Sequence, residues 1–310
     1  MPFRSGYVAI VGRPNSGKST LVNALVGRKV AIVSPRPQTT RNRIHGIVNR
    51  ANAQLVLIDT PGLHKPDSAL NRQMMQEAAG ALDGVDILSL MVDASEEPGP
   101  GDRFALDWMR RFRGTSFLLL NKIDRIPKAL LLPLIDSYSR QHDFAEVFPI
   151  SALTGDGLVP LVENWIARLP QNPPYFPTDQ FTDQPERFLA AELIREKAIL
   201  ATREEVPYAL AVLIERFEET ERLIRIHATL FVERDGQKGI LIGKGGAMLK
   251  RIGTAARLEI EHLLGTKVYL ELFVKVHPNW RQNPALVRQL DWHRQLAQMS
   301  AHEIPGNDEP

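Results

Sequence analysis

Cysteine is absent from the 310 residues of this sequence, and so is any long uninterrupted apolar run. Without cysteine the chain has no disulfide scaffold, thiolate zinc site, iron–sulfur ligand or cysteine nucleophile. The longest apolar runs, such as residues 117–120, are far shorter than the roughly 20 residues that a membrane-spanning helix needs. The first residues also lack an apolar core of signal-peptide length. These absences predict a soluble protein in the reducing environment of the cytoplasm.

A large excess of charge of one sign is also missing. The chain has 38 Lys and Arg against 36 Asp and Glu, a formal net charge of +2. Net charge alone therefore does not make it a polyanion binder, and any basic patch must be local. Its 44% hydrophobic and 24% charged residues are typical of globular proteins. At roughly 150 residues per domain, the length predicts two domains.

The first half alternates short apolar runs with longer amphipathic segments, which predicts an α/β fold with a mostly parallel, doubly wound sheet. The expected strands are residues 7–11, 55–58, 87–92, 117–120 and 147–150, and the expected helices are 20–26, 69–82, 102–113 and 158–167. Residues 44–48, just before the strand at 55–58, indicate an antiparallel edge hairpin.

Five prolines between Pro170 and Pro185 separate the two halves. Proline at this density is incompatible with a helix or a central strand, so this stretch is predicted to be a linker. The predicted division is a first domain at 1–170, the linker at 171–186, a second domain at 187–290 and a C-terminal tail at 291–310.

The second half predicts an α+β domain. Its expected helices are residues 187–202 and 247–264, with a helix-like stretch at 286–296, and its expected strands are 209–216, 223–232 and 267–275. The mixed charges of the helix at 187–202 predict a solvated face. Trp280 and Trp292, beside Arg281 and Arg288, could stack on bases, but packing of the chain onto its own domain is the favoured interpretation.

Residues 12–19 read GRPNSGKS and follow the first predicted strand. They match the pattern G-x-x-x-x-G-K-[ST], which wraps backbone N–H groups and a helix N-terminus around a phosphate. Lys18 would neutralise β- and γ-phosphate oxygens, and the Ser19 hydroxyl would bind Mg²⁺. The nucleotide-binding residues predicted here are Gly12, Arg13, Pro14, Asn15, Ser16, Gly17, Lys18, Ser19 and Thr20.

Residues 121–124 read NKID at the end of a predicted strand. The Asp124 carboxylate can accept hydrogen bonds from the N1–H and 2-amino groups of guanine, which adenine does not offer there, so the pattern predicts GTP rather than ATP. Asn121 would tie this loop to the phosphate loop, and the Lys122 stem would cover one face of the base. Ser151 and Ala152 end the next predicted strand and would bring a backbone N–H to guanine O6.

Residues 59–63 read DTPGL after the strand at 55–58. Asp59 is predicted to bind Mg²⁺ through water, and the Gly62 N–H to sense the γ-phosphate. The remaining residues of this nucleotide-binding segment are Thr60, Pro61 and Leu63.

These segments resemble the small GTPases in order and spacing across the first domain. The resemblance narrows to the Era family at residues 37–41, PQTTR, and 59–66, DTPGLHKP. In that family the first of these segments is a switch, which implies that Thr40, with Thr39 as the alternative, closes on Mg²⁺ when γ-phosphate is present.

Leu63 stands where Ras-like enzymes carry the Gln that orients the attacking water. Related GTPases with an Asn in the phosphate loop hold a potassium ion where an arginine finger would otherwise reach, and Asn15 occupies the matching position. The resemblance thus implies K⁺ bound through Asn15 and Mg²⁺ bound through Ser19, Thr40 and Asp59. The residues assigned catalytic roles are Lys18, Thr40, Gly62 and Asn15.

Residues 240–247 read ILIGKGGA, an apolar stretch joined to a predicted helix by a G-x-x-G turn. The stretch from 236 to 258 carries five cations and no acid. This pattern resembles a KH domain of the bacterial type, which binds single-stranded RNA. The predicted RNA-binding residues are Gly243, Lys244, Gly245, Gly246, Lys250 and Arg251.

A GTPase domain joined to a KH domain resembles the Era family over nearly the whole chain. The resemblance implies a GTP/GDP switch that binds the single-stranded 3′ end of 16S ribosomal RNA and assists 30S subunit assembly, as a cytoplasmic monomer. Two alternatives stay open: an RNA-binding protein with a static nucleotide domain, and a signalling GTPase that associates weakly with the inner membrane through its basic surface.

Overall fold

The computed structural model describes residues 2–63 and 66–290, which form two compact units. The first is built mainly from residues up to Gln184 and the second mainly from residues after it. No helix within the described ranges is long and apolar enough to cross a membrane.

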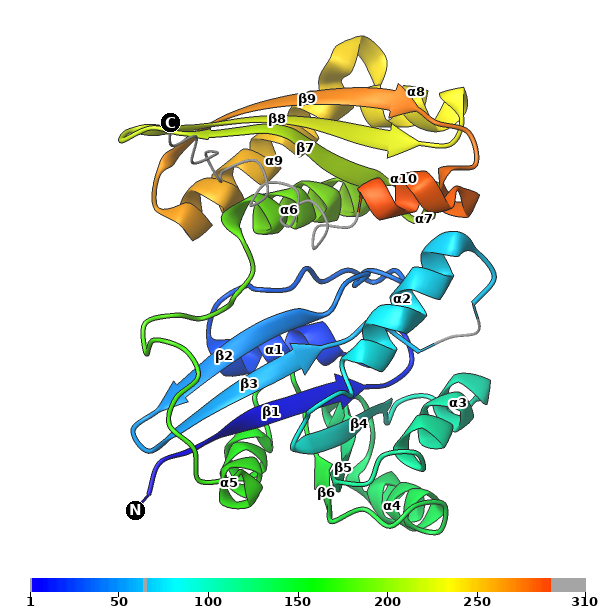
Figure 1. Cartoon of the computed structure of the whole chain (residues 1–310). Helices are drawn as coiled ribbons and strands as arrows, with labels where there is room; N and C mark the ends of the chain where they lie inside the picture. The colour runs from blue at the N-terminus through cyan, green and yellow to red at the C-terminus, as the bar shows by residue number, and fades with distance from the viewer. Residues whose placement is uncertain (1, 64–65, 291–310) are drawn as a thin grey trace, which may run out of the picture. The chain divides into compact units, whose positions relative to one another are not determined.

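The first unit contains a six-stranded sheet in the order β2-β3-β1-β4-β5-β6 (Figure 1). Its strands are β1 (Arg4–Val11), β2 (Ile44–Arg50), β3 (Ala53–Asp59), β4 (Ile87–Asp93), β5 (Thr115–Asn121) and β6 (Glu146–Pro149). All neighbours are parallel except β2 and β3. The predicted parallel α/β fold and its antiparallel edge hairpin are both confirmed.

Among the described residues, five α-helices accompany this sheet: α1 (Lys18–Val26), α2 (Ala69–Gly80), α3 (Pro100–Met109), α4 (Leu131–Ser139) and α5 (Leu158–Arg168). Every residue of β3 and β4 is buried, as expected for central strands of a covered parallel sheet. The strands β1, β3, β4 and β5 run in one direction, so their carboxyl ends and the loops that follow share one edge of the sheet.

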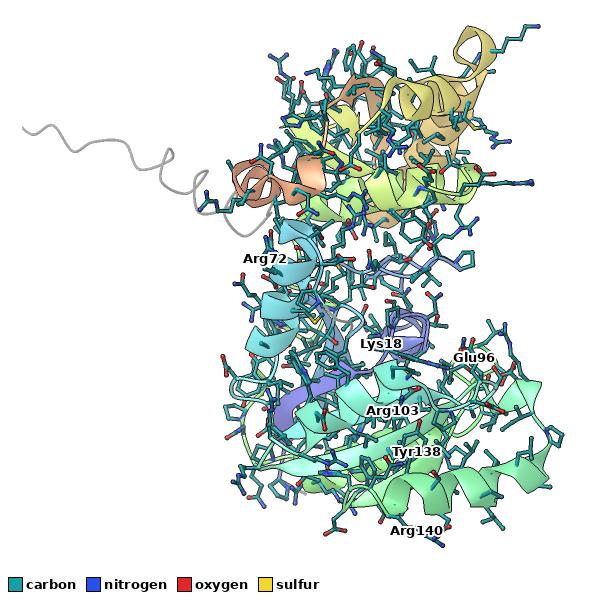
Figure 2. The ribbon with its side chains drawn as sticks, turned by 90° about the vertical axis from the view of Figure 1, so that its right-hand side faces the viewer. Lys18, Arg72, Glu96, Arg103, Tyr138 and Arg140 are labelled. Carbon is teal, nitrogen blue, oxygen red and sulfur yellow. The ribbon has the colours of Figure 1, made fainter. Side chains whose placement is uncertain are left out.

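The helix α4 was not predicted from the sequence. It reads LLPLIDSYS. Its proline argues against a helix, and Leu132 adds an apolar residue outside the buried face, where it is 74% exposed, so the helical spacing of the apolar residues is hard to see in the sequence. The structure shows the face directly, because Tyr138 is fully buried while Arg140, just past the helix, points outward (Figure 2).

The proline-rich stretch has no helix or strand between residues 170 and 185, yet it lies along the first unit. Backbone groups of Ile47 and Phe181 hydrogen-bond at 2.8 Å, and the Thr182 hydroxyl donates to the His45 carbonyl at 2.6 Å. The Asn49 amide donates to the Thr178 carbonyl at 2.9 Å. Residues 178–183, the later part of the predicted linker, therefore cover β2, the edge strand of the sheet, which blocks pairing with another chain.

Gln54 anchors this segment, and we expect its replacement by Ala to lower the free energy of unfolding by about 2–4 kcal/mol. Its fully buried side chain accepts from the backbone N–H groups of Tyr175 (2.8 Å) and Phe176 (3.0 Å) and donates to the Phe176 carbonyl (2.8 Å). Removing the amide leaves these groups without their partner. Urea unfolding measures the change, and Gln141→Ala, at an exposed site, should change it by less than about 0.5 kcal/mol. Equal effects of the two substitutions would contradict the anchoring role.

The second unit is an α+β fold, as predicted. Its sheet has the order β7-β8-β9, with β7 and β8 antiparallel and β8 and β9 parallel. The strands are β7 (Ala211–Glu219), β8 (Leu223–Val232) and β9 (Lys267–Val276). The helices are α6 (Glu186–Ala201), α7 (Val206–Ala209), α8 (Asp235–Ile242), α9 (Ala247–Leu264) and α10 (Pro284–Gln289). The predicted helix at 286–296 is thus described only in its first part, and residues 291–310, Trp292 among them, lie outside the described ranges.

The predicted solvated face of α6 is wrong. Arg195 and Glu196 are 3% and 2% exposed, because α6 packs against both α9 and β7. The buried charges are paired: Arg195 contacts Glu192 at 2.6 Å, and Lys197 contacts Glu196 at 3.0 Å and also Glu259 on α9. Buried charges are tolerated where they are paired in this way.

Candidate nucleotide-binding site and nucleic-acid interface

A cavity of about 500 Å³ lies at the edge of the first sheet where the parallel strands end. The structure brings most of the predicted nucleotide-binding residues to its wall: Pro14, Asn15, Gly17, Lys18, Ser19, Thr20, Thr40, Gly62, Asn121, Lys122, Asp124, Ser151 and Ala152. The other predicted residues support this wall without lining it: Gly12, Arg13, Ser16, Asp59, Thr60, Pro61 and Leu63.

The phosphate loop connects β1 to α1, and its backbone geometry depends on Gly17. This residue has φ 103°, and a Cβ there would lie 2.2 Å from the Asn121 amide nitrogen. A side chain would therefore push away the loop that Asn121 begins. Lys18, the first residue of α1, donates to the backbone carbonyls of Gly12 (3.1 Å) and Arg13 (3.0 Å), which holds its ammonium inside the loop.

Burial shifts the pKa values of the two opposite charges at this site. Lys18 is 5% exposed and Asp59 fully buried. Burial lowers the pKa of Lys18 to about 8, with the charge of Asp59 acting in the opposite direction. Burial likewise raises the pKa of Asp59 to about 6, against the effects of Lys18 and of hydrogen bonds from Ser19 and Thr40.

The three predicted magnesium ligands converge. The Ser19 hydroxyl lies 2.8 Å from that of Thr40 and donates to Asp59 Oδ2 at 2.6 Å, while Thr40 donates to the same oxygen at 3.4 Å. The second oxygen, Oδ1 of Asp59, is buried and has no hydrogen-bond partner among the described residues. Two hydroxyls and a carboxylate with an unused oxygen suit a hard cation such as Mg²⁺.

Thr39, the alternative to Thr40, also lines the cavity, but its hydroxyl does not join that of Ser19 at Asp59. Its hydroxyl is 2.6 Å from that of Ser34 and donates to the Arg36 carbonyl at 2.7 Å. These contacts hold it within its own loop, so the geometry favours Thr40.

The segment after β3 fits closely against the phosphate loop. The Thr60 hydroxyl donates to the Ile10 carbonyl at 2.7 Å, and the Leu63 N–H donates to the Gly12 carbonyl at 3.0 Å. A Cβ on Gly62 would lie 2.7 Å from the Pro14 backbone. Leu63 is fully buried, so its side chain packs in the core and plays no part at the position of an attacking water.

The loop at residues 121–124, which we call the base-recognition loop, is fixed at its first residue. The Asn121 amide donates to the Ser16 carbonyl at 2.7 Å and accepts from the Ala152 N–H at 2.9 Å, as the predicted tie to the phosphate loop requires. The Ser151 hydroxyl donates to Asp124 Oδ1 at 2.6 Å. Ser151 was predicted for its backbone only, and this side-chain contact orients the carboxylate at the cavity.

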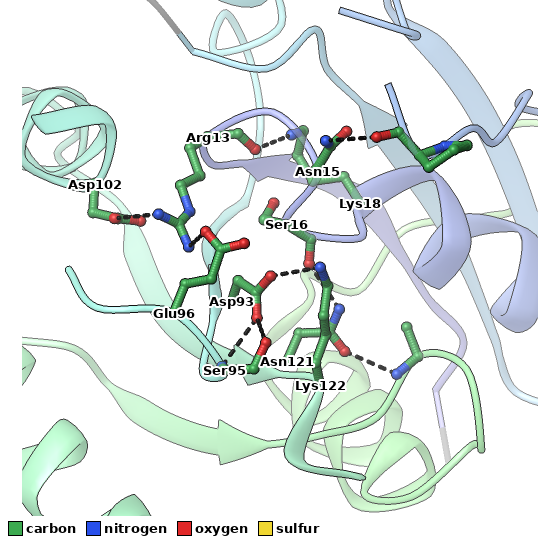
Figure 3. A network of polar contacts seen from close by, with 12 residues as sticks. Arg13, Asn15, Ser16, Lys18, Asp93, Ser95, Glu96, Asp102, Asn121 and Lys122 are labelled. Atoms are coloured by element: carbon green, nitrogen blue, oxygen red, sulfur yellow. Dashed lines mark hydrogen bonds and ion pairs between the residues drawn. The ribbon is translucent and has the colours of Figure 1, made fainter. Parts of the chain in front are cut away.

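Three acids were not predicted from the sequence, one at the end of β4, one in the loop that follows and one in α3 (Figure 3). Lys122 pairs with Asp93 at 2.5 Å, and Arg13 pairs with Glu96 at 2.7 Å and Asp102 at 3.3 Å. Arg13 thus points toward α3. An acid directly after the apolar run at 87–92 was the available signal for Asp93, because it falls at the ligand-binding edge of the sheet.

The predicted RNA-binding turn is a short 3-10 helix, Lys244–Gly246, between α8 and α9. Gly243, Gly245 and Gly246 have φ 71°, 58° and 81°, and a Cβ on Gly245 or Gly246 would meet nothing within 4 Å. The backbone there is open to close approach by a ligand. The predicted apolar lead-in at 240–242 is the last turn of α8, a helix that Gly236 and Gly239 conceal in the sequence.

Cations surround this turn, and an edge strand lies beside it. Lys244, Lys250 and Arg251 are all exposed. Strand β9, at the edge of its sheet, contacts both α8 and α9. Trp280 is fully buried and donates from Nε1 to the Ala209 carbonyl at 2.7 Å, so it packs the domain, as the sequence favoured, and does not stack on bases.

Two family models match the chain. One, described as a 50S ribosome-binding GTPase, matches residues 7–122. The other, described as a KH domain, matches residues 205–281. They fall on the first and the second unit, respectively.

Curated relatives match nearly the whole chain. A GTPase Era from Syntrophus aciditrophicus is 50% identical over 94% of this chain and 96% of its own length. A GTPase Era from Geobacter metallireducens is 51% identical over 94% of this chain and 98% of its own length.

Two solved structures agree over the same span, each with 43% identity, 94% of this chain covered and 99% of the other chain covered. A single-residue variant of Aquifex aeolicus Era bound to GDP and AlF4⁻ has a TM-score of 0.88. An Era bound to MgGDPNP and nucleotides 1506–1542 of 16S ribosomal RNA has a TM-score of 0.89.

Proposed function

The chain belongs to the Era family of GTPases, and from that premise we propose that it couples its GTP hydrolysis to the binding of small-subunit ribosomal RNA. Its first unit is a GTPase domain and its second a KH domain, which favours a hydrolysing switch over an RNA-binding protein with a static nucleotide domain. The observation that carries the RNA assignment is the open, cation-flanked turn at Gly243–Gly246. A 43% identical Era of the same architecture is bound to a segment of 16S RNA, which favours the small subunit over the large one.

In the proposed nucleotide site, each residue acts on one part of GTP. Lys18 neutralises the β- and γ-phosphates, and the Gly62 N–H donates to the γ-phosphate. Asp124 accepts from the base, while Asn121 and Ala152 complete its pocket. Ser19, Thr40 and Asp59 hold Mg²⁺, which stabilises the negative charge that develops on the phosphate oxygens. The unused Asp59 oxygen supports this ligand set.

The proposed RNA site uses the residues around the turn. The backbone at Gly243, Gly245 and Gly246 lets the RNA backbone approach, Lys244 meets a phosphate, and Lys250 and Arg251 extend the positive surface along α9. Unstacked bases would lie between α9 and β9, so single-stranded RNA is the expected ligand.

We further propose that γ-phosphate and Mg²⁺ order residues 36–41 and 62–67, of which residues 64 and 65 lie outside the described ranges, and thereby alter RNA affinity. This switch would serve assembly of the 30S subunit in the cytoplasm, with the protein acting as a monomer.

Binding of RNA spanning 1506–1542 of 16S should depend on both the turn and the nucleotide. A double variant that combines Lys244→Ala with Gly245→Asp should lower the affinity for this RNA by about 30-fold or more. It removes one phosphate contact and places an anion against the RNA backbone. The GTPase rate should stay unchanged. Fluorescence anisotropy measures affinity, with Lys267→Ala, just beyond the far end of α9, as the control.

The same titration with a GTP analogue, with GDP and without nucleotide tests the switch. Equal affinity in all three states would contradict coupling. Equal affinity of the variant and the wild type would contradict the RNA site, and binding of acidic vesicles that RNA does not displace would favour the membrane alternative.

We propose that K⁺ assists hydrolysis through Asn15. This residue has φ 63°, lines the cavity and donates to the Pro35 carbonyl at 3.2 Å, so its amide and a backbone oxygen already lie together. Because Leu63 is buried and cannot orient the attacking water, hydrolysis needs another aid, and a cation that stabilises the developing negative charge is physically sufficient.

Replacing Na⁺ by K⁺ should therefore raise kcat by about tenfold or more, a barrier change of about 1.4 kcal/mol. Asn15→Ala should abolish the difference between the two salts. Phosphate release at constant ionic strength measures the rates. Equal wild-type rates in both salts would contradict the role of K⁺, and Asn15 would then serve only to shape the turn of the phosphate loop.

A further inference from the structure

Asp93 ends β4 at the point where the base-recognition loop begins on the neighbouring strand. In the parallel pairing of β4 and β5, Asp93 lies opposite Asn121. The N–H of the next residue, Ala94, donates to the Asn121 carbonyl at 2.8 Å. Asp93 is thus fixed beside the loop at 121–124 without lining the cavity itself.

The Asp93 residue is only 2% exposed, and both oxygens of its carboxylate accept hydrogen bonds from protein groups. Oδ2 accepts from Lys122 Nζ at 2.5 Å, and Oδ1 accepts from the backbone N–H (3.0 Å) and hydroxyl (2.6 Å) of Ser95. Burial acts to raise the pKa of Asp93, but these hydrogen bonds outweigh it and lower the pKa below its usual value. The carboxylate is therefore a charged, oriented acceptor at neutral pH.

Lys122 needs such an anchor. Its backbone has φ 67°, a conformation that non-glycine residues seldom adopt. Its side chain is 21% exposed and lines the cavity beside Asp124. A free lysine samples many rotamers, whereas the ion pair with Asp93 holds the ammonium at one place and so fixes the course of the aliphatic stem (Figure 3).

We propose that Asp93 is a positioning residue for guanine nucleotides, which holds the Lys122 stem along the base end of the cavity before the nucleotide arrives. Fixing a flexible side chain in advance removes an ordering cost from binding and raises affinity. The Lys122 stem lies at the end of the cavity that receives the base, away from the γ-phosphate. Asp93 should therefore affect the affinities for GTP and GDP equally. It makes no contact that distinguishes guanine from other purines, a choice that remains with Asp124.

Asp93→Asn tests this role because it keeps the side-chain shape and removes the charge that attracts Lys122. The Kd values of GTP and GDP should both rise about 10- to 100-fold, the usual range for loss of a charge-assisted hydrogen bond. Their ratio should stay within about twofold, and kcat at saturation should change little. Fluorescent-nucleotide titration and phosphate release measure these values. Asp136→Asn, which removes an exposed acid paired with Arg140, is the matched control and should be silent.

A double-mutant cycle with Lys122→Met separates positioning from a structural role. Met keeps the apolar stem and lacks the ammonium, so Asp93→Asn should alter Kd by less than about twofold in that background. Additive losses in the double variant, or an unchanged Kd in the single Asp93 variant, would overturn the proposal.

Ser95→Ala provides a second route if Asp93→Asn does not fold. It removes one hydrogen bond to Asp93 and leaves the Lys122 pair, so Kd should rise a few-fold, by an amount that Lys122→Met abolishes. An unchanged Kd in this variant would count against the proposal. The inference rests on guanine-nucleotide binding, which wild-type titration tests separately: a wild type that binds neither GTP nor GDP would remove the site itself, whereas silent variants would remove only the role of Asp93.

Discussion

Asp124→Asn should change the preferred nucleotide from GTP to XTP. The carboxylate accepts from N1–H and the 2-amino group of guanine, whereas an amide offers one acceptor and one donor. Guanine would then place its 2-amino group against an N–H donor. Xanthine carries a carbonyl at that position and would pair with the amide instead. We expect GTP affinity to fall about 10³-fold or more, in the range that unpaired polar groups cause at selective sites.

Competition binding with GTP, XTP and ATP measures this change. Asp124 is exposed at the cavity, so the variant should fold normally, and Asp136→Asn again serves as the control. If wild-type protein bound ATP as well as GTP, or if Asp124→Asn kept its preference for GTP, the assignment of this loop to guanine recognition would be wrong.

Lys18→Met should lower kcat/KM for GTP by about 10³-fold or more, about 4 kcal/mol of transition-state stabilisation. Methionine has nearly the length of lysine but cannot neutralise the phosphate oxygens. Steady-state phosphate release measures the loss. Lys128→Met, at an exposed lysine of the same unit, should leave the rate unchanged.

The stability of the Lys18→Met variant distinguishes a lost function from a lost fold. Burial lowers the pKa of Lys18 to about 8, so the charged form is costly in the nucleotide-free protein. Replacing it by an apolar side chain of similar size removes this cost but also removes the cation that offsets the burial of Asp59, so the free energy of unfolding should change by less than about 2 kcal/mol. A variant that lost activity together with several kcal/mol of stability would point to misfolding instead.

The local signals in the sequence were sufficient for the phosphate loop, the base loop and the parallel sheet. Each of these motifs is contiguous and follows a run of apolar residues, and parallel strands bring their carboxyl ends to one edge. The sequence patterns therefore predict one shared site for four residues from separate segments: Lys18, Asp59, Asn121 and Asp124. Helix α8 escaped detection because its glycines lower helix propensity, and α4 because its apolar residues are not all on a buried face.

Both folds and the kind of nucleotide follow from the order of the amino acids alone, because strand–loop–helix motifs and hydrophobic periodicity are local properties of the chain. Long-range packing was needed to establish the attachment of residues 178–183 to β2, the burial of the α6 charges and the pairing of Asp93 with Lys122. In each of these cases the partners are far apart in the sequence or are buried by a distant element. The energy of a buried hydrogen bond or ion pair depends on that surrounding, which no local pattern specifies.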